Sequence, residues 1–284
     1  MASTDLVKQF EKPLFPDIFW NRPLNRQTAK KLLIIGGHSK QFSQTQASYS
    51  AAKASGIGDA KVVLPESTRK YVKSVPDCLF VAETKSGSLA KAAYPQIKAF
   101  IKESDGVLLA GESSINSETT SLMEHLLVET KKPLIISNEL VATMLYRPQS
   151  LRSHPNRLVL APTKLLLKLA DALKLAIKLQ AGGLPAKNAL LGALAADTKL
   201  DIILLGHELM VSSGTKTSVT NVDDFLPDMF GLTRGVFATF YLQHADKFQA
   251  LTTAAYVLSK VSKLKNQGLA SSLKNLKHTI DTYS

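Results

Sequence analysis

The sequence predicts an α/β fold in which a mainly parallel sheet lies between layers of helices. Short apolar segments such as 32–35 (LLII) and 202–205 (IILL) alternate along the chain with longer amphipathic segments. Strands that are apolar on both faces are typical of parallel sheets covered by helices on each side. The 284 residues contain no internal repeat and no low-complexity linker, so we expect a single domain over residues 30–284. Residues 1–29, rich in proline and aromatic residues, are expected to form an irregular arm that packs on this domain.

Strands and helices are expected to alternate through the body of the chain. The apolar segments predict strands at 32–37, 60–65, 78–83, 106–112, 132–139, 157–162 and 201–206. The amphipathic segments predict helices at about 44–54, 88–104, 117–130, 163–180 and 230–264. Ser117 is the expected capping residue of the third helix, because a serine hydroxyl can accept a free N–H of the first turn.

The composition indicates a globular protein rather than a disordered or membrane-spanning one. Hydrophobic residues make up 45% of the chain and charged residues 20%. Charges interrupt every apolar run before it reaches the roughly 18 residues of a membrane span, and the first residues do not resemble a secretory signal. The single cysteine, Cys78, begins an apolar segment, which favours a buried structural role over that of a nucleophile. These features predict a cytoplasmic protein with no membrane partner.

The formal net charge of +12 makes the chain strongly basic. A basic surface attracts anions, but nucleic acid is not the expected partner, because aromatic residues make up only 7% of the chain and do not alternate with basic ones. The lysines of segment 163–180 would also suit a helix that lies on a membrane surface. Since this segment lies between two predicted strands, we expect it to be a crossover helix with a solvated lysine face.

Six segments, in this order, resemble motifs of the ribokinase-like superfamily, and most closely those of the ADP/ATP-dependent NAD(P)H-hydrate dehydratases. The opening LLIIGGHSKQFSQTQASYSAAKAS is similar to their first strand, turn and helix, and SDGVLLAGESS to their segment ending in GPGLG. KPLIISNEL, LAPTKLLLKLAD and IILLGHELMV are similar to KPLVLDADALN, LTPHPGE and VVLKG. FGLTRGVFATFYL is similar to the helix start GSGDVLAGIIAALL. The resemblance covers about residues 31–262 and implies a three-layer ribokinase-like sandwich.

The resemblance also implies a ligand site at the carboxyl edge of the sheet. The residues that it places against the substrate are Gly37, His38, Gly111, Glu112, Asn138 and Thr163. The residues that it places against a nucleotide are Gly206, Gly231, Thr233, Arg234 and Gly235. It implies ADP or ATP as the cofactor, accompanied by Mg²⁺, and a homo-oligomer as the assembly.

The residues alone leave some of these roles open. His38 follows a glycine turn, and an exposed loop histidine with no ligand would give the same pattern. No His, Cys or acidic residues have the spacing of metal ligands, so we expect no dedicated metal site. Asp223, Asp224 and Asp228 could hold Mg²⁺ with a phosphate, but a solvated acidic loop is the expected structure.

Arg234 falls where the resemblance places the aspartate that takes the proton. A general base must exchange a proton near neutral pH, whereas a guanidinium stays protonated to above about pH 12. The sequence therefore predicts a divergent dehydratase-like protein that binds ADP or ATP but has no base at this position. The alternatives are a non-enzymatic binding or assembly protein on the same fold, and a small-molecule kinase, which would lack the same base.

The segment 230–235 is expected to be a glycine-rich turn that forms an anion site. Gly231 and Gly235 would let the backbone approach a ligand closely, and the helix that follows would direct free N–H groups at it. Arg234 would then be the charged arm of the site. In the alternative interpretation, Arg234 pairs with Asp228 or Asp224 and only closes the loop.

Overall fold

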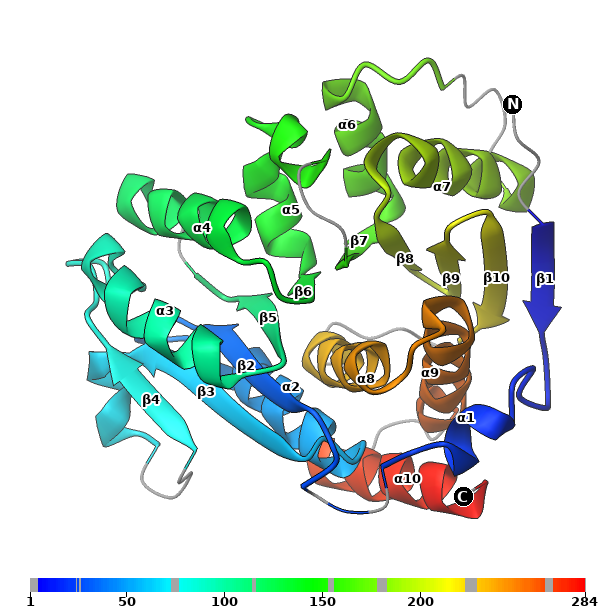
Figure 1. Ribbon diagram of the computed structural model, residues 1–284, viewed down its shortest axis with the longest axis horizontal. Coiled ribbons are helices and arrows are strands. Elements are labelled where there is room, and N and C mark those ends of the chain that lie inside the picture. Colours follow the sequence, from blue (N-terminus) through cyan, green and yellow to red (C-terminus); the bar gives the residue numbers. More distant parts are fainter. Residues whose placement is uncertain are drawn as a thin grey trace.

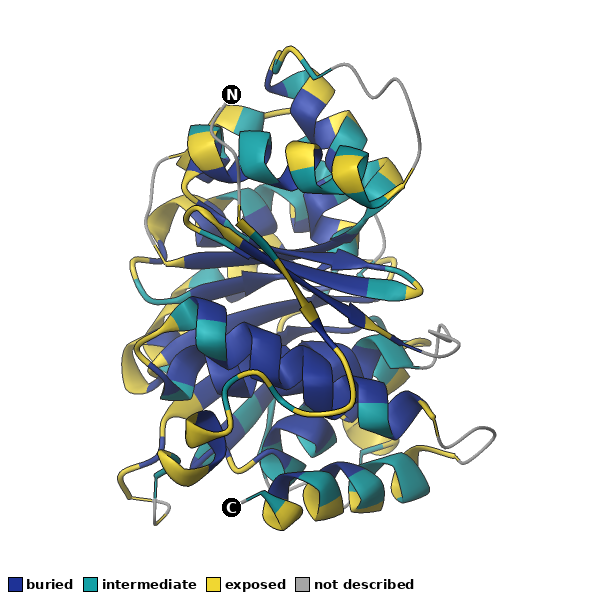
Figure 2. Cartoon of the chain, turned by 90° about the vertical axis from the view of Figure 1, so that its right-hand side faces the viewer, coloured by how far each residue is buried: buried dark blue, intermediate teal, exposed yellow. Residues whose placement is uncertain are grey.

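A single sheet with helices on both of its faces forms the body of the molecule (Figure 1). The computed structural model describes residues 5–23, 25, 27–72, 77–113, 116–152, 156–177, 183–222, 229–263 and 268–283. Seen from the side, the sheet is a buried middle layer between two layers of helices, whose outer faces are exposed (Figure 2). The predicted α/β class is confirmed.

The strands expected from the sequence form a parallel array. These strands are β2 (Lys31–Gly36), β3 (Asp59–Pro65), β4 (Cys78–Val81), β5 (Gly106–Gly111), β6 (Leu134–Ile136), β7 (Arg157–Pro162) and β8 (Asp201–Leu205). The hairpin of β9 (Glu208–Ser213) and β10 (Lys216–Asn221) continues the sheet beyond β8. With β1 (Asp5–Gln9) beside β10, the strand order is β1-β10-β9-β8-β7-β6-β5-β2-β3-β4.

The helices fall into two groups, one on each face of the sheet. One face packs against α1 (Asp17–Trp20), α2 (Ser43–Ala54), α8 (Met229–Gln243), α9 (Lys247–Ser262) and α10 (Leu269–Thr282). The other face packs against α3 (Tyr94–Glu103), α4 (Ser117–Glu129), α5 (Asn138–Met144), α6 (Thr163–Ala172) and α7 (Leu184–Thr198). Strands such as β5 supply buried residues to both hydrophobic cores, which explains why their sequences are continuously apolar.

The N-terminal segment is not the irregular arm that the sequence predicts. Its residues Asp5–Gln9 form β1, which pairs in parallel with β10 at one edge of the sheet. The buried Gln9 amide donates to Thr220 Oγ1 at 3.0 Å and to Thr252 O at 2.8 Å, which fixes the end of the strand. Most side chains of β1 are exposed. An edge strand of this kind is held by backbone hydrogen bonds, so it leaves no apolar pattern in the sequence.

Two of the predicted helices end earlier than expected. Segment 230–264 is divided into α8 and α9, because Asp246 caps α9 by accepting the Gln249 N–H at 3.0 Å. The helix expected at 163–180 ends at Ala172, and residues 178–180 lie outside the described part of the chain.

Two further predictions differ in detail from the structure. The cap of α4 is Asn116 rather than Ser117, and its Oδ1 accepts the Thr119 N–H at 2.8 Å. The helix expected at 88–104 begins with a short 3₁₀ turn, and its regular part is α3.

Two broader expectations can be compared with the described residues. Among them, no helix is both long enough and apolar enough to cross a bilayer. Cys78 is half-buried on β4, and burial raises the pKa of its thiol to about 11. A thiol with this pKa is protonated at neutral pH and is a poor nucleophile, which agrees with a structural role.

Candidate functional site

The carboxyl ends of five neighbouring strands form one edge of the sheet. β2, β5, β6, β7 and β8 are mutually parallel and adjacent in the strand order. Ligands of open α/β sheets bind outside this kind of edge. Gly37, Glu112, Thr163 and Gly206 directly follow their strands, and Asn138 lies two residues beyond the end of β6. All five were expected at the site from the sequence, and they lie along this one edge.

Gly37 and Gly111 hold the ends of β2 and β5 together. The Gly37 N–H donates to Gly111 O at 2.8 Å, and the two residues have φ angles of 87° and 83°. Such angles favour glycine. A Cβ on Gly111 would also collide with the carboxylate of Glu139 and lie 3.1 Å from Ser137 Oγ. Gly111 is therefore required by the packing of this strand end.

The Glu112 carboxylate caps the first turn of α2. Its Oε1 accepts the Gln44 N–H at 3.0 Å, while Oε2 accepts the Thr45 N–H at 2.7 Å and the Thr45 hydroxyl at 2.9 Å. A carboxylate is stabilised at a helix N-terminus by the free N–H groups and by the helix dipole. The residue is 6% exposed and has a φ of 57°. The N-terminus of α2 is thus occupied by a carboxylate of the chain itself.

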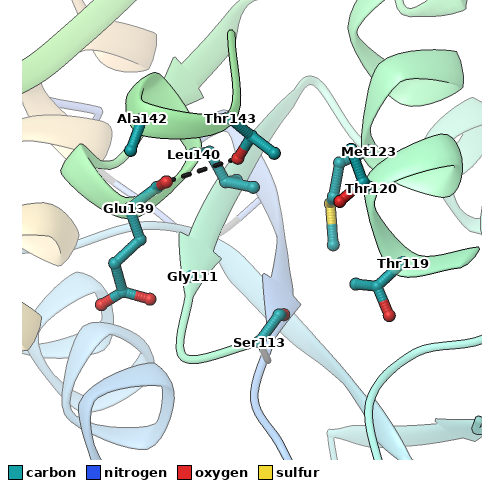
Figure 3. A pocket seen from close by; sticks show the side chains of 9 residues that line it. All are labelled: Gly111, Ser113, Thr119, Thr120, Met123, Glu139, Leu140, Ala142 and Thr143. Atoms are coloured by element: carbon teal, nitrogen blue, oxygen red, sulfur yellow. Dashed lines mark hydrogen bonds between the residues drawn. The ribbon is translucent and has the colours of Figure 1, made fainter. Parts of the chain in front are cut away.

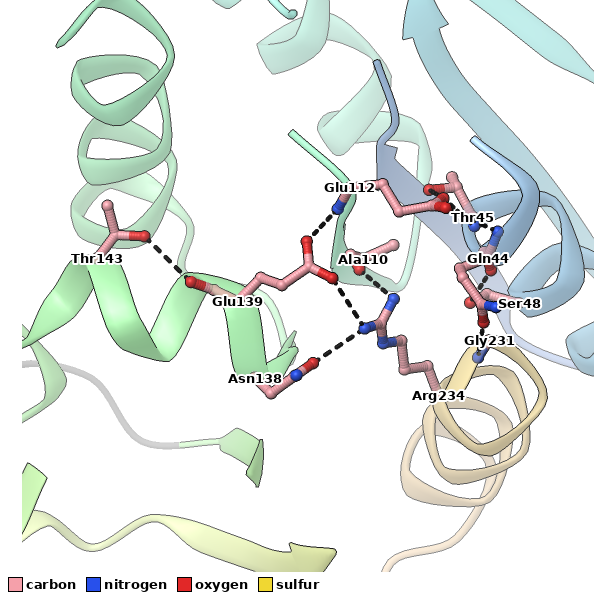
Figure 4. Close-up of polar contacts among 10 residues, drawn as sticks. All are labelled: Gln44, Thr45, Ser48, Ala110, Glu112, Asn138, Glu139, Thr143, Gly231 and Arg234. Atoms are coloured by element: carbon pink, nitrogen blue, oxygen red, sulfur yellow. Dashed lines mark hydrogen bonds and ion pairs between the residues drawn. The ribbon is translucent and has the colours of Figure 1, made fainter. Parts of the chain in front are cut away.

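Arg234 lies in the second turn of α8 and reaches the carboxyl ends of β5 and β6 (Figure 4). One terminal nitrogen donates to Ala110 O at 2.5 Å, and the other donates to Asn138 Oδ1 at 2.9 Å and to Glu139 Oε1 at 3.4 Å. The side chain is 3% exposed. Asp224 and Asp228, the partners considered from the sequence, lie outside the described residues.

The charge of Arg234 is balanced by carboxylates nearby. Burial lowers the pKa of its guanidinium, whereas Glu139 and Glu112 act in the opposite direction. An arginine in such surroundings remains a cation. Its hydrogen bonds in this structure go to groups within the protein.

Glu139 links Glu112, which caps α2, to Arg234 of α8. It was not selected as a site residue from the sequence. Its Oε2 accepts the backbone N–H of Glu112, and its Oε1 faces Arg234. The available signal was an acidic residue three positions after the end of β6, in or close to the position where the family has the acidic DADAL segment. The Glu139 side chain is 43% exposed, so it is also the part of the network that a ligand can reach.

The glycine-rich turn predicted at 230–235 is wrong, because these residues belong to α8. A Cβ on Gly231 would lie 2.5 Å from Gln44 O, and a Cβ on Gly235 would collide with Ser48 O. Both glycines therefore let α8 pack closely against α2, and the two helices are in extensive contact. The Gly231 N–H is already occupied, since it donates to Gln44 Oε1 at 2.6 Å.

The remaining predicted residues lie apart from the Arg234 network. Thr233 is fully buried within α8. His38 is held by its own loop, where Nδ1 accepts the Lys40 N–H at 3.1 Å and Nε2 lies 2.6 Å from Ser86 O. Thr163 and Gly206 are half-buried at the ends of β7 and β8. None of the three hydrogen bonds of Arg234 described above reaches these residues.

A pocket of about 220 Å³ opens beside the network, between α4 and α5 (Figure 3). Its wall includes Gly111 at the end of β5 and the exposed side of Glu139. Within the described ranges, no group of three or more His, Cys, Asp or Glu residues is arranged to hold a metal ion. Asp223, Asp224 and Asp228, considered for Mg²⁺ from the sequence, lie outside these ranges.

The fold resembles those of several solved structures, although no family model and no curated protein sequence matches this chain. A ribokinase-like superfamily protein from Enterococcus faecalis aligns with a TM-score of 0.78 at 13% identity, over 98% of this chain and 96% of that chain. A hypothetical protein from Streptococcus mutans aligns with a TM-score of 0.77 at 16% identity, over 96% of this chain and 100% of that chain.

A third structure is that of the ADP/ATP-dependent NAD(P)H-hydrate dehydratase from Bacillus subtilis, co-crystallized with ATP/Mg²⁺ and soaked with CoA. It aligns with a TM-score of 0.70 at 12% identity, over 97% of this chain and 100% of that chain. Likeness at such low identity concerns the fold. This chain has the ribokinase-like fold that the order of its motifs predicts.

Proposed function

We propose that this protein binds ADP or ATP at the carboxyl edge of its sheet and does not dehydrate NAD(P)H hydrate. The observation that carries the second part of the proposal, the absence of dehydration, is the buried Arg234, held by Ala110, Asn138 and Glu139. A general base must accept a proton near neutral pH, and a guanidinium paired with a carboxylate cannot. The position that the resemblance assigns to the base thus holds a fixed positive charge.

Nucleotide binding is supported by the fold and by the charge of the chain. The Bacillus subtilis dehydratase of the same fold was co-crystallized with ATP/Mg²⁺. This chain carries a formal net charge of +12, which attracts phosphate groups over several ångströms. Nucleotide binding through the fold and the charge needs no catalytic base, so it can persist in a protein that has lost turnover.

The residues of α8 do not fit a bound phosphate. Thr233 is fully buried, the Gly231 N–H is bonded to Gln44, and Arg234 is bonded to groups within the protein. A phosphate at this position would have to displace these internal partners. We therefore assign no phosphate contact to residues 231–235.

The ends of β7 and β8 fit a phosphate better. α6 begins at Thr163, and its capping residue Pro162 makes no side-chain hydrogen bond to the first turn. The backbone N–H groups of that turn therefore have no side-chain partner from Pro162, and N–H groups at a helix start can bind a phosphate. The space beside the Cα of Gly206 is free of close neighbours, because the nearest atom to an added Cβ would be Glu208 O at 3.8 Å. We assign Thr163 and Gly206 to the nucleotide, and any Mg²⁺ would arrive bound to its phosphates.

Thermal denaturation tests the proposal. The protein is heated alone and with ADP, with ATP and Mg²⁺, with NAD, or with NADH, each in a separate sample. A ligand that binds the folded state at 100 times its Kd adds about 2.7 kcal/mol to the free energy of unfolding. For a chain of this size, each kcal/mol of added stability raises Tm by roughly 2 to 4 °C. We therefore expect ADP and ATP to raise Tm by several degrees, and by more at higher nucleotide concentration. No rise with either nucleotide would contradict the proposal.

A pair of matched variants locates the binding. Gly206→Asp introduces a negative charge where we place the phosphate, and we expect it to weaken ADP binding by at least about tenfold. Gly268→Asp adds the same charge before α10, where no atom lies within 4 Å of an added Cβ. Equal effects of the two substitutions would show that overall charge, and not the ends of β7 and β8, determines the affinity.

A further inference from the structure

β1 is the outermost strand at one end of the sheet. It lies at the right-hand margin of the molecule in Figure 1, and Figure 2 views that margin directly. One side of β1 pairs with β10, and no described strand pairs with its other side. An edge strand with unpaired backbone N–H and C=O groups can be extended by a strand of another chain.

Natural edge strands often carry features that prevent such pairing, and β1 has few of them. A proline or a bulge would protect the edge. The segment Asp5–Gln9 contains no proline, and its pairing with β10 is continuous. Lys8 is the kind of residue that protects an edge, so a partner strand must pair with β1 without bringing another cation opposite Lys8.

Exposed apolar side chains accompany the open edge. Val7 is 39% exposed on β1, Phe10 just after the strand is 71% exposed, and Leu14 is 40% exposed. Leu14 lies beside the end of the strand, because its N–H donates to Gln9 Oε1 at 3.0 Å. Exposed apolar side chains concentrated in one short segment indicate a surface that gains free energy when a partner covers it.

The opposite end of the sheet is better protected. The side chains of β4 are buried or half-buried. The Arg69 guanidinium lies over the Phe80 ring, 4.4 Å from the ring centre, and Arg69 belongs to the 3₁₀ helix Glu66–Lys70 beside β4. A chain of copies that joined β1 of one molecule to β4 of the next is therefore disfavoured relative to a closed pair through β1.

Two copies can pair through β1 in one favourable register. In an antiparallel pair with two-fold symmetry, one residue lies opposite its own copy. Lys8 in that position would bring two lysines together, which is destabilising. Leu6 in that position would leave Lys8 and Gln9 without an opposite residue of the strand. Val7 in that position pairs the whole strand, with Val7 opposite Val7, Leu6 opposite Lys8, and Asp5 opposite Gln9.

We propose that β1 is the interface of a homodimer, in which two sheets join through antiparallel β1 strands with Val7 at the two-fold axis. Backbone hydrogen bonds hold the two strands together, and Val7, Phe10 and Leu14 supply the apolar surface. Such a segment is short beside the roughly 20 to 30 residues per side of a standard interface. We therefore expect a weak dimer, with a Kd on the order of 10 µM.

This dimer keeps the two nucleotide sites apart. β1 is parallel to β10, and both have the direction of β8, because β8 and β10 are each antiparallel to β9. When two β1 strands pair antiparallel, the carboxyl ends of β8 in the two copies lie on opposite edges of the joined sheet. The inference thus goes beyond nucleotide binding and does not depend on it.

Sedimentation velocity of the full chain over about 1 to 200 µM tests the proposal. We expect a monomer at the low end of this range and a dimer at the high end. Each copy carries a formal net charge of +12, so the copies repel each other. Raising NaCl from about 0.05 to 0.5 M screens this repulsion and should lower the dimer Kd at least about threefold. A monomer throughout, or oligomers that grow beyond the dimer, would overturn the proposal.

Val7→Lys and Val128→Lys form a matched pair of variants. Val7→Lys brings two lysines together at the two-fold axis and should raise the dimer Kd at least about tenfold. Val128→Lys makes the same substitution on α4, where the side chain is 49% exposed, and should leave the dimer Kd unchanged. Equal dimer Kd values for the two variants would place the interface elsewhere and overturn the proposal.

A cysteine cross-link tests the register, in a chain whose own cysteine is removed by Cys78→Ser. Val7→Cys places two thiols opposite each other within reach of a disulfide, so oxidised glutathione should produce a covalent dimer. Lys8→Cys is the control, because the register places it opposite Leu6. No covalent dimer from Val7→Cys, or one that forms equally fast from Lys8→Cys, would overturn the proposed pairing.

The dimer and the nucleotide site fail independently of each other. ADP binding by a protein that stays monomeric would refute the dimer and leave the proposed function intact. A dimer that does not bind ADP would do the reverse.

Discussion

At the scale of single residues, Arg234 determines what the carboxyl edge of the sheet can do. It places a cation among Ala110, Asn138 and Glu139, at the ends of β5 and β6. A buried charge is tolerated when its hydrogen bonds are satisfied, and it becomes costly when a partner is removed. Arg234 is therefore expected to contribute to stability through this network rather than to bind a ligand.

Replacing Arg234 with alanine separates these two roles. We expect the free energy of unfolding to fall by about 3 kcal/mol, because Glu139 and Ala110 O lose their partner, and the affinity for ADP to change less than twofold. Urea denaturation and ADP titration measure the two quantities. Arg147→Ala is the control, since Arg147 forms an exposed pair with Glu124 and should cost about 0.5 kcal/mol or less. A tenfold loss of ADP affinity at unchanged stability would make Arg234 a phosphate ligand.

His244, just after α8, should make the stability depend on pH. It is 7% exposed, and burial, with Lys247 and Arg22 nearby, lowers the pKa of its imidazole from 6.5 to about 4. The unfolded chain therefore binds a proton on His244 between these pH values, and the folded chain does not. As the pH falls through this window, the free energy of unfolding should decrease by up to about 3 kcal/mol.

His244→Phe should remove this part of the pH dependence. The phenyl ring keeps the aromatic contact with Phe240, whose ring centre lies 5.9 Å from that of His244. Burial raises the pKa of Asp201, so its contribution to the free energy of unfolding changes with pH in the opposite direction to that of His244. Asp201 is present in both proteins, so its contribution cancels in the comparison. Equal slopes of stability against pH in the two proteins would show that His244 is not buried in its neutral form.

At the scale of elements, the contact between α2 and α8 depends on two glycines. Gly235→Ala would place a methyl group against Ser48 O and 2.8 Å from Ala51 Cβ. Backbone atoms cannot move aside cheaply, so we expect a loss of about 3 kcal/mol or more, at or above the usual cost of overpacking. Gly268→Ala is the control, because an added Cβ there meets no atom within 4 Å. Denaturant titrations that gave both variants the same stability would contradict this helix packing.

These glycines also explain where prediction from the sequence failed. The parallel strands could be predicted because each is apolar on both faces, and burial on both sides leaves that pattern. Gly231 and Gly235 were interpreted as a turn, because a glycine needed for helix contact and a glycine needed for a turn look alike in one sequence. β1 was missed since its residues are held by backbone bonds and carry mostly exposed side chains.

At the scale of the whole molecule, topology predicts which residues share the carboxyl edge of the sheet but not which of them are in contact. Parallel strands bring their carboxyl ends to one edge, so Gly37, Glu112 and Thr163 lie along that edge, and their contact with a ligand stays a prediction. Which groups bond to one another depends on helix positions that the pattern does not encode. The Glu112 cap of α2 and the Glu139 contact with Arg234 are examples, and each joins residues more than 60 positions apart.

We propose that this protein keeps a ligand-binding edge but has Arg234 at the position where the resemblance places the base. Loss of a general base commonly lowers a rate by about 10² to 10⁴. In the proposal, the nucleotide lies at the ends of β7 and β8, which the hydrogen bonds of Arg234 do not reach. The two properties are therefore expected to be separate in this molecule.

The most direct measurement is ³¹P NMR of one sample that contains the full chain, ATP, Mg²⁺ and NADH hydrate. We expect the ATP resonances to broaden or shift as the protein is added, with ADP forming no faster than in a sample without protein. ATP resonances unaffected by the protein would contradict nucleotide binding. Growth of ADP coupled to loss of the hydrate, at a rate approaching the ~10 per second of an ordinary enzyme, would show that Arg234 does not stand in the place of the base.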